Sequence, residues 1–123
     1  ALYNDEIDLI MSLFPIPYVG TFPANNVPDL KKGEYAIINN KSGPGEHWVA
    51  ITKDASGQTF VFDSFGRDRD EYLPINLQNK FRGASDTHDK PEQHILEVNC
   101  GAHSIAWIVT AHKFGPKTVA KYI

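Results

Sequence analysis

Apolar residues recur at helical spacing close to the N-terminus. Between Ile7 and Phe14, the apolar side chains at positions 7, 10, 11 and 14 fall on one face of a helix. Asn4 can cap this helix, and Pro15 and Pro17 end it because proline lacks the amide hydrogen that the next turn needs. We therefore predict an amphipathic helix at the start of the chain.

A second helical pattern covers residues Cys100–Phe114. Ala102, Ile105, Ala106 and Val109 form one apolar stripe, and further apolar residues lie on the other faces. A helix that is apolar nearly all round is typically buried. Asn99 is suited to cap this helix, and the pair Gly-Pro at 115–116 is a stop signal. The pattern predicts a central buried helix that begins at Cys100.

Three segments between these helices have the composition of strands. They are Tyr35–Asn39, residues 47–53 and residues 59–65. The last two are joined by residues 54–58, which include Gly57, so we expect an antiparallel hairpin.

The other segments have weaker patterns. Residues 17–32 and 82–92 are predicted to be loops, residues 74–81 a short helix, and residues 95–98 a short strand. The predicted fold class is α+β, with a small mixed or antiparallel sheet packed on the central helix that carries Cys100.

Composition narrows the class of protein. The chain has 123 residues, of which 41% are hydrophobic and 22% charged, so we expect one globular domain over residues 1–123. We expect no signal peptide and no membrane-spanning segment. One cysteine rules out an internal disulfide and a cysteine-based zinc site, which favours a reducing compartment. A net charge of −3 argues mildly against a dedicated nucleic-acid binder, which usually has an excess of basic residues. The remaining histidines have no metal-binding spacing, so we expect no metal and no cofactor: His88, His94, His103 and His112.

Four residues supply the side chains that a thiol protease needs. Cys100 attacks as a thiolate, which the helix N-terminus and an imidazolium both stabilise. His47 is the candidate base, and Asp63 on the neighbouring strand can orient its ring. Gln93 is a neutral amide donor for a developing oxyanion, and Gly101 leaves room for a substrate backbone beside the Cys100 amide.

Each of these residues has an ordinary explanation when it is taken singly. A cysteine at a helix start is usually a small buried side chain, and a strand histidine or a turn aspartate is commonplace. The order of the four along the chain, each in the secondary structure that the mechanism requires, favours catalysis.

The motifs around these residues resemble the adenovirus maturation protease family (adenain) and its relatives in virophages and adenovirus-like elements. The resemblance covers about residues 18–111. It rests on five blocks: Gly20-Thr21-Phe22, Tyr35–Asn39, Gly45-Glu46-His47-Trp48-Val49-Ala50, Phe62-Asp63-Ser64-Phe65-Gly66, and Gln93 placed seven residues before Cys100. More distantly, the proteases that remove ubiquitin-like modifiers share this order and belong to the same structural clan.

The resemblance implies a viral cysteine endopeptidase that cleaves capsid and core precursors at small-residue, glycine-type sites during virion maturation. By position, Cys100 is the nucleophile, His47 the general base and acid, and Asp63 the third member of the triad. Gln93 and the Cys100 amide form the oxyanion hole. We expect substrate contacts from six residues: Gly20, Thr21, Phe22, Glu46, Trp48 and Gly101.

The expected partners follow from the same resemblance. They are the viral precursor proteins and an activating peptide, which cannot be disulfide-linked because the chain has no second cysteine. We do not expect DNA or a membrane as a partner. The expected location is the virion and the reducing assembly site in the host cell.

Two other functions remain open. A protease for ubiquitin-like modifiers would turn over a modifier that ends in Gly-Gly and leave capsid precursors intact. A non-catalytic binding module on the protease fold would have an unreactive Cys100.

Overall fold

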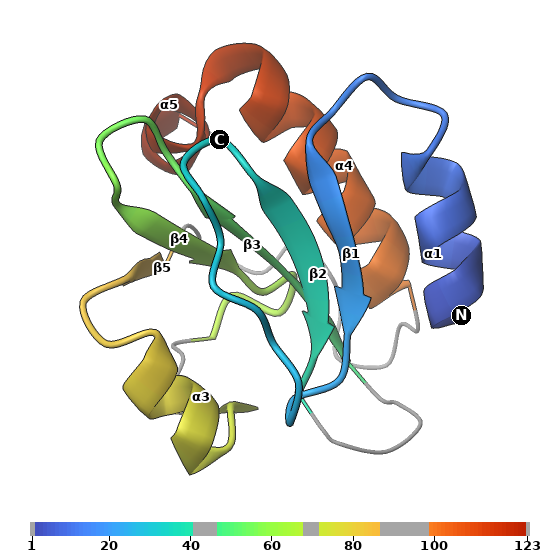
Figure 1. The fold of residues 1–123 in the computed structure, drawn as a ribbon. Coiled ribbons are helices and arrows are strands. Elements are labelled where there is room, and N and C mark those ends of the chain that lie inside the picture. Colours follow the sequence, from blue (N-terminus) through green and yellow to red (C-terminus); the bar gives the residue numbers. More distant parts are fainter. Residues whose placement is uncertain (1, 41–46, 68–71, 87–98, 123) are drawn as a thin grey trace.

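The computed structural model describes residues 2–40, 47–67, 72–86 and 99–122. Within these residues the chain forms a five-stranded sheet whose strands lie side by side in the order of the sequence (Figure 1). The strands are β1 (Tyr18–Phe22), β2 (Tyr35–Asn39), β3 (Trp48–Lys53), β4 (Thr59–Phe62) and β5 (Ser85–Asp86).

The sheet is mixed. Strands β2, β3 and β4 are antiparallel, whereas β1 pairs parallel to β2 and β5 pairs parallel to β4. Asn39 at the end of β2 is paired with Trp48 at the start of β3. The end of β2, the start of β3 and the end of β4 therefore lie at the same end of the three central strands, and the candidate site is built there.

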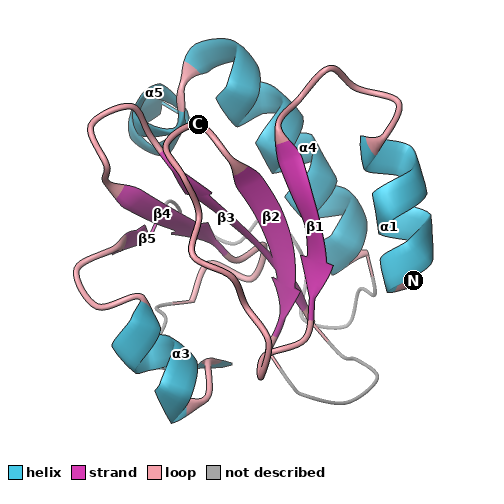
Figure 2. Cartoon of the chain, in the orientation of Figure 1, coloured by secondary structure: helices cyan, strands magenta, loops and turns pink. Residues whose placement is uncertain are grey.

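Helices cover both faces of the sheet (Figure 2). The cluster on one face is built with residues of α1 (Asn4–Met11), α4 (Cys100–Phe114) and α5 (Pro116–Tyr122). Helix α3 (Ile75–Lys80) contributes to the cluster on the other face. No helix in the described ranges is long and apolar enough to cross a bilayer.

Strict alternation along the strands separates two apolar clusters. In β2, Tyr35 and Ile37 face the cluster with α4, and Ala36 and Ile38 face the cluster with α3. All five residues of β2 are buried. A strand buried on both faces explains why this segment has an uninterrupted apolar sequence.

The α+β class and several elements are confirmed. Strand β2 and helix α4 have the predicted bounds, β3 and β4 form the predicted hairpin, and α3 begins directly after Pro74. The predicted strand at 95–98 lies outside the described residues.

Two strands lie in segments that were predicted to be loops, and one helix lies in a segment for which no element was predicted. Strand β1 lies within the predicted loop 17–32, since pairing with β2 outweighs Gly20, which sits at a register shift with φ of 141°. The two-residue strand β5 lies in the predicted loop 82–92, where it extends the edge of β4. Helix α5 begins at Pro116 directly after Gly115, so the stop signal separates two helices.

Helix ends and helix exposure also differ from the predictions. Tyr3 rather than Asn4 is the N-cap of α1, and the Glu6 carboxylate accepts from the Tyr3 amide at 2.8 Å. Asn99 is at the N-cap position of α4 but makes no side-chain cap bond. Ala102 and Ala106, two members of the predicted apolar stripe, are exposed, so α4 is buried on one broad face and not nearly all round.

Candidate active site

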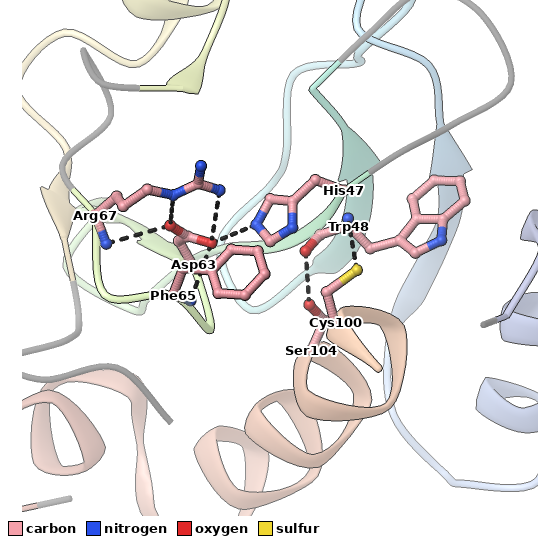
Figure 3. A network of polar contacts seen from close by, with 7 residues as sticks. All are labelled: His47, Trp48, Asp63, Phe65, Arg67, Cys100 and Ser104. Atoms are coloured by element: carbon pink, nitrogen blue, oxygen red, sulfur yellow. Dashed lines mark hydrogen bonds and ion pairs between the residues drawn. The ribbon is translucent and has the colours of Figure 1, made fainter. Parts of the chain in front are cut away.

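Three elements bring the candidate triad together at this end of the three central strands. His47 directly precedes β3, Asp63 directly follows β4, and Cys100 is the first residue of α4. Because β3 and β4 are antiparallel, the start of one strand lies beside the end of the other. In Figure 3 the imidazole of His47 lies between the carboxylate of Asp63 and the sulfur of Cys100. The side chains predicted from the sequence to act together are therefore neighbours.

The imidazole ring is fixed through one of its nitrogens. Its Nε2 is hydrogen-bonded to Oδ1 of Asp63, and the sulfur of Cys100 lies on the other side of the ring (Figure 3). With Nε2 turned to the carboxylate, Nδ1 is the nitrogen that remains for the sulfur. This is the tautomer in which a histidine can take a proton from a thiol while its other N–H is fixed by an acid.

Both carboxylate oxygens of Asp63 have partners. Oδ1 accepts from His47 and from the backbone amide of Phe65 at 3.3 Å. Oδ2 accepts from Nε of Arg67 at 2.8 Å and from the Arg67 amide at 3.2 Å. Asp63 has no exposed surface. Burial acts to raise its pKa, but the bonds to His47 and Arg67 outweigh burial and lower the pKa to about 2. The carboxylate is therefore ionised at neutral pH.

The histidine and the cysteine shift in opposite directions. Burial disfavours a charged imidazole, but the bonds to Asp63 and Cys100 outweigh it, and the pKa of His47 is raised. Burial likewise disfavours a thiolate, but the bonds from His47 and the Trp48 amide outweigh it, and the pKa of Cys100 is lowered. These opposite shifts favour a thiolate–imidazolium pair.

Trp48 ties the nucleophile to the sheet. Its backbone amide donates to Sγ of Cys100 at 3.4 Å, and its carbonyl accepts from Oγ of buried Ser104 at 3.2 Å. Its indole Nε1 donates to the carbonyl of Leu2 at 2.9 Å. The first turn of α4 is thus fixed against the first residue of β3, which directly follows the candidate base.

Two aromatic rings enclose the imidazole. Phe65 stacks on His47 with centroids 4.8 Å apart and an interplanar angle of 15°. Tyr72 meets the same ring edge-on at 6.0 Å. His47 is only 5% exposed and Cys100 only 7%. A dry, apolar setting of this kind strengthens the electrostatic contacts within the triad.

The residues predicted to contact substrate have other roles here. The side chain of Trp48 packs against the cluster shared with α4, as its strand position predicts. Gly101 is buried, and a Cβ at this position would lie 3.2 Å from Trp48 and 3.3 Å from Leu2. On the side where a Cβ would point, the space beside Gly101 is filled by the chain itself. A larger residue here would require its neighbours to shift by a few tenths of an ångström.

The Gly-Thr-Phe segment at 20–22 belongs to β1. The hydroxyl of Thr21 is hydrogen-bonded to Tyr18 and donates to Asp8 at 2.7 Å. Phe22 packs in the cluster with α3, on the face of the sheet away from α4. Among the contacts of the described residues, none joins these three positions to the triad. Gln93 and Glu46 lie outside the described residues.

Sequence reasoning missed Arg67, Tyr72 and Ser104. Ser104 carries a weak signal, as a polar residue four positions after Cys100 on an otherwise apolar face. Arg67 stands four positions after Asp63 in a turn, where no periodic pattern points to it. In the described ranges, no group of three or more His, Cys, Asp or Glu side chains is arranged to hold a metal ion.

Comparison of the chain with protein-family models and with curated protein sequences finds no match. The case for chemistry at this site therefore rests on the geometry of the triad and on the motifs around it.

Proposed function

We propose that this chain is a cysteine endopeptidase with an adenain-type fold, a viral enzyme that matures capsid and core precursor proteins. The observation that carries the proposal is His47 held between the buried carboxylate of Asp63 and the sulfur of Cys100. Each of these three side chains is commonplace when it occurs alone. A base that is hydrogen-bonded to its orienting acid and lies beside a thiol with a lowered pKa has the parts of a triad.

The proposed reaction begins with the thiolate of Cys100. Sγ attacks the scissile carbonyl carbon, and the electron pair of the C=O bond moves onto oxygen. When the tetrahedral intermediate collapses, the C–N bond breaks and the imidazolium of His47 gives its proton to the leaving amine. His47 then takes a proton from water, whose oxygen attacks the thioester. The acid product leaves, and the thiolate–imidazolium pair is restored.

The first turn of α4 offers backbone N–H donors for an oxyanion. The first backbone amides of a helix have no intrahelical partner and carry the positive end of the helix dipole. The Cys100 amide is in this first turn. We assign it as one oxyanion donor and Gln93 as the other.

The motif resemblance supports the choice of substrate. The proposed cleavage sites have small residues, of the glycine type, in viral structural precursors. The proposed location is the virion and the reducing assembly compartment, which would keep the single thiol of the chain reduced. An activating peptide that binds without a disulfide remains part of the proposal.

The first experiment measures the rate of Cys100 alkylation by iodoacetamide against pH. Labelling reports on one site because the chain has one cysteine. We expect rapid labelling well below about pH 8, since an ordinary thiol ionises near 8.5. His47→Ala should move labelling to higher pH. His112→Ala, at an exposed position in the last turn of α4, is the matched control and should leave the profile unchanged. A wild-type profile that rises only near pH 8.5 would contradict the proposal.

The second experiment identifies the substrate. Wild type and Cys100→Ala are each incubated with a capsid precursor and with a ubiquitin-like modifier that carries a blocked Gly-Gly end. We expect cleavage of the precursor by the wild type only. Turnover of the modifier alone would assign the chain to the related class of modifier proteases.

A further inference from the structure

Arg67 binds the same carboxylate of Asp63 that His47 contacts (Figure 3). Its Nε and its backbone amide both donate to Oδ2, at 2.8 and 3.2 Å, and Nη2 lies 3.5 Å from Oδ1. Asp63 is fully buried, whereas the Arg67 side chain is 32% exposed. The buried carboxylate of Asp63 therefore contacts two basic groups. Arg67 is always charged, whereas the charge of His47 depends on pH.

The guanidinium of Arg67 is also held by the two rings that enclose His47. Its Cζ lies 4.9 Å from the centroid of Phe65 and 4.8 Å from that of Tyr72. Phe65 stacks on the imidazole, and Tyr72 meets it edge-on. Contacts of a guanidinium with aromatic faces restrict its position and add to the ion pair.

We propose that Arg67 is a positioning residue of the triad: it fixes Asp63 for His47 and limits how strongly that carboxylate attracts the imidazole proton. The inference rests on the proposed function, because it describes the same site. It adds a fourth side chain and a defined electrostatic role.

The physical argument concerns an unopposed carboxylate. An ionised Asp63 with no other cation would stabilise the imidazolium strongly and make His47 a poor proton donor to a leaving amine. A guanidinium stays charged at every pH of interest and offsets part of this attraction. In the ion-pair state the charges then alternate along the row, from Arg67 through Asp63 and His47 to Cys100.

The ionisable groups placed against His47 come from three elements. Asp63 lies in the turn after β4, Cys100 opens α4, and Tyr72 lies just before α3. Arg67 acts on His47 through Asp63. Removing its charge should raise the pKa of His47 more than that of Cys100, which is the more distant of the two.

The test is a titration of His47 by NMR in the full chain, with the resonance assigned by its loss in His47→Ala. Arg67→Gln removes the charge. Arg67→Lys keeps the charge but loses the planar guanidinium, which donates through more than one nitrogen. Arg82→Gln is the matched control, because Arg82 is an exposed arginine bonded to Asn79. We expect Arg67→Gln to raise the pKa of His47 by roughly 0.5–1 unit. Arg67→Lys should stay close to wild type, and the control should not move.

The rate of Cys100 alkylation against pH is recorded for the same variants. Arg67→Gln should shift the profile upward, and Arg67→Lys should restore its position. A His47 pKa and an alkylation profile that both match wild type in Arg67→Gln would overturn the inference. If that variant does not fold, Arg67→Lys decides: the inference expects the His47 pKa and the alkylation profile of wild type, and a shift of either one in this charge-keeping variant overturns it. A wild-type thiol of ordinary reactivity would instead contradict the proposed function, and the His47 titration would still test Arg67.

Discussion

The backbone amide of Trp48 donates a hydrogen bond to the sulfur of Cys100, 52 positions further along the chain. Trp48 directly follows His47, so two consecutive residues contact the candidate nucleophile, one through an imidazole and one through a backbone N–H. An amide donor does not titrate, so it stabilises a thiolate at any pH. We therefore expect His47→Ala to raise the pKa of the Cys100 thiol, but to leave it below that of an ordinary thiol.

Asp63→Asn should reduce kcat/KM less than His47→Ala does. The imidazole moves the proton, and removing it should cost roughly 10²- to 10⁴-fold. Asp63 orients the ring and stabilises its charge, and asparagine keeps the shape of that contact. Steady-state kinetics on a glycine-site peptide, with folding checked by near-UV circular dichroism, makes the comparison. Equal and complete loss in two folded variants would give Asp63 a larger role than we assign.

Asp63 should also make stability depend on acid pH. Its pKa is about 2 in the folded chain against an ordinary value of 3.8. The unfolded chain therefore takes up this proton first as the pH falls. The stabilisation is fully present above about pH 4 and is lost towards pH 2, with a size of roughly 2 kcal/mol.

Urea unfolding at a series of pH values tests this prediction. In Asp63→Asn the loss of stability between about pH 4 and pH 2 should be smaller than in wild type. Asp29→Asn removes an exposed carboxylate paired with Lys80 and is the control. An acid profile in Asp63→Asn that matched the wild type would mean that another group causes the loss.

Ser104→Ala should loosen the contact between α4 and β3. The Ser104 hydroxyl has no exposed surface and donates to the carbonyl of Trp48. We expect a loss of about 1–2 kcal/mol in the free energy of unfolding, together with slower alkylation of Cys100. Thr110→Ala is the control, since the Thr110 hydroxyl donates within its own helix, to the carbonyl of Ala106. Equal stabilities for the two variants would show that the Ser104 bond does not dock the helix.

Gly20→Ala separates a structural role from a substrate-binding role. Gly20 has φ of 141°, and a Cβ there would lie 3.0 Å from the Phe22 ring. We expect a loss of about 1–3 kcal/mol in unfolding free energy and an unchanged KM. Val19→Ala, on the same edge strand and partly exposed, is the control. A raised KM with normal stability would return Gly20 to the substrate site.

Gln93→Ala tests the second oxyanion donor. Loss of one such donor typically lowers kcat by about 10²-fold, because the oxyanion forms only in the transition state. KM should change little. An unchanged kcat would remove Gln93 from the site.

The triad could be predicted because its geometry depends on local patterns. The antiparallel hairpin brings the start of β3, which His47 precedes, close to the end of β4, which Asp63 follows, and the apolar pattern of α4 places Cys100 at a helix start. Predicting that His47 lies near Asp63 required only the local hairpin and no pairing between distant segments. For Cys100 it was enough that a helix with a broad apolar face must pack on the sheet.

The remainder depends on contacts that no local pattern encodes. Strand β1 has a glycine in its centre and prolines on both sides, so only its pairing with β2 makes it a strand. The close approach of Gly101 to Leu2 could not be predicted, because it joins residues from opposite ends of the sequence. Arg67 acquires its partners through a turn and through Tyr72, neither of which has a periodic signature.

The bond between Trp48 and Cys100 also orders events during synthesis. The chain leaves the ribosome from its N-terminus, so β3 and β4 can pair before α4 has been made. Until α4 docks on the sheet, the sulfur lacks both its amide donor and the neighbouring imidazole. The reactivity that we propose therefore arises only after α4 has docked, and an unfinished chain would carry no activated nucleophile near newly made proteins.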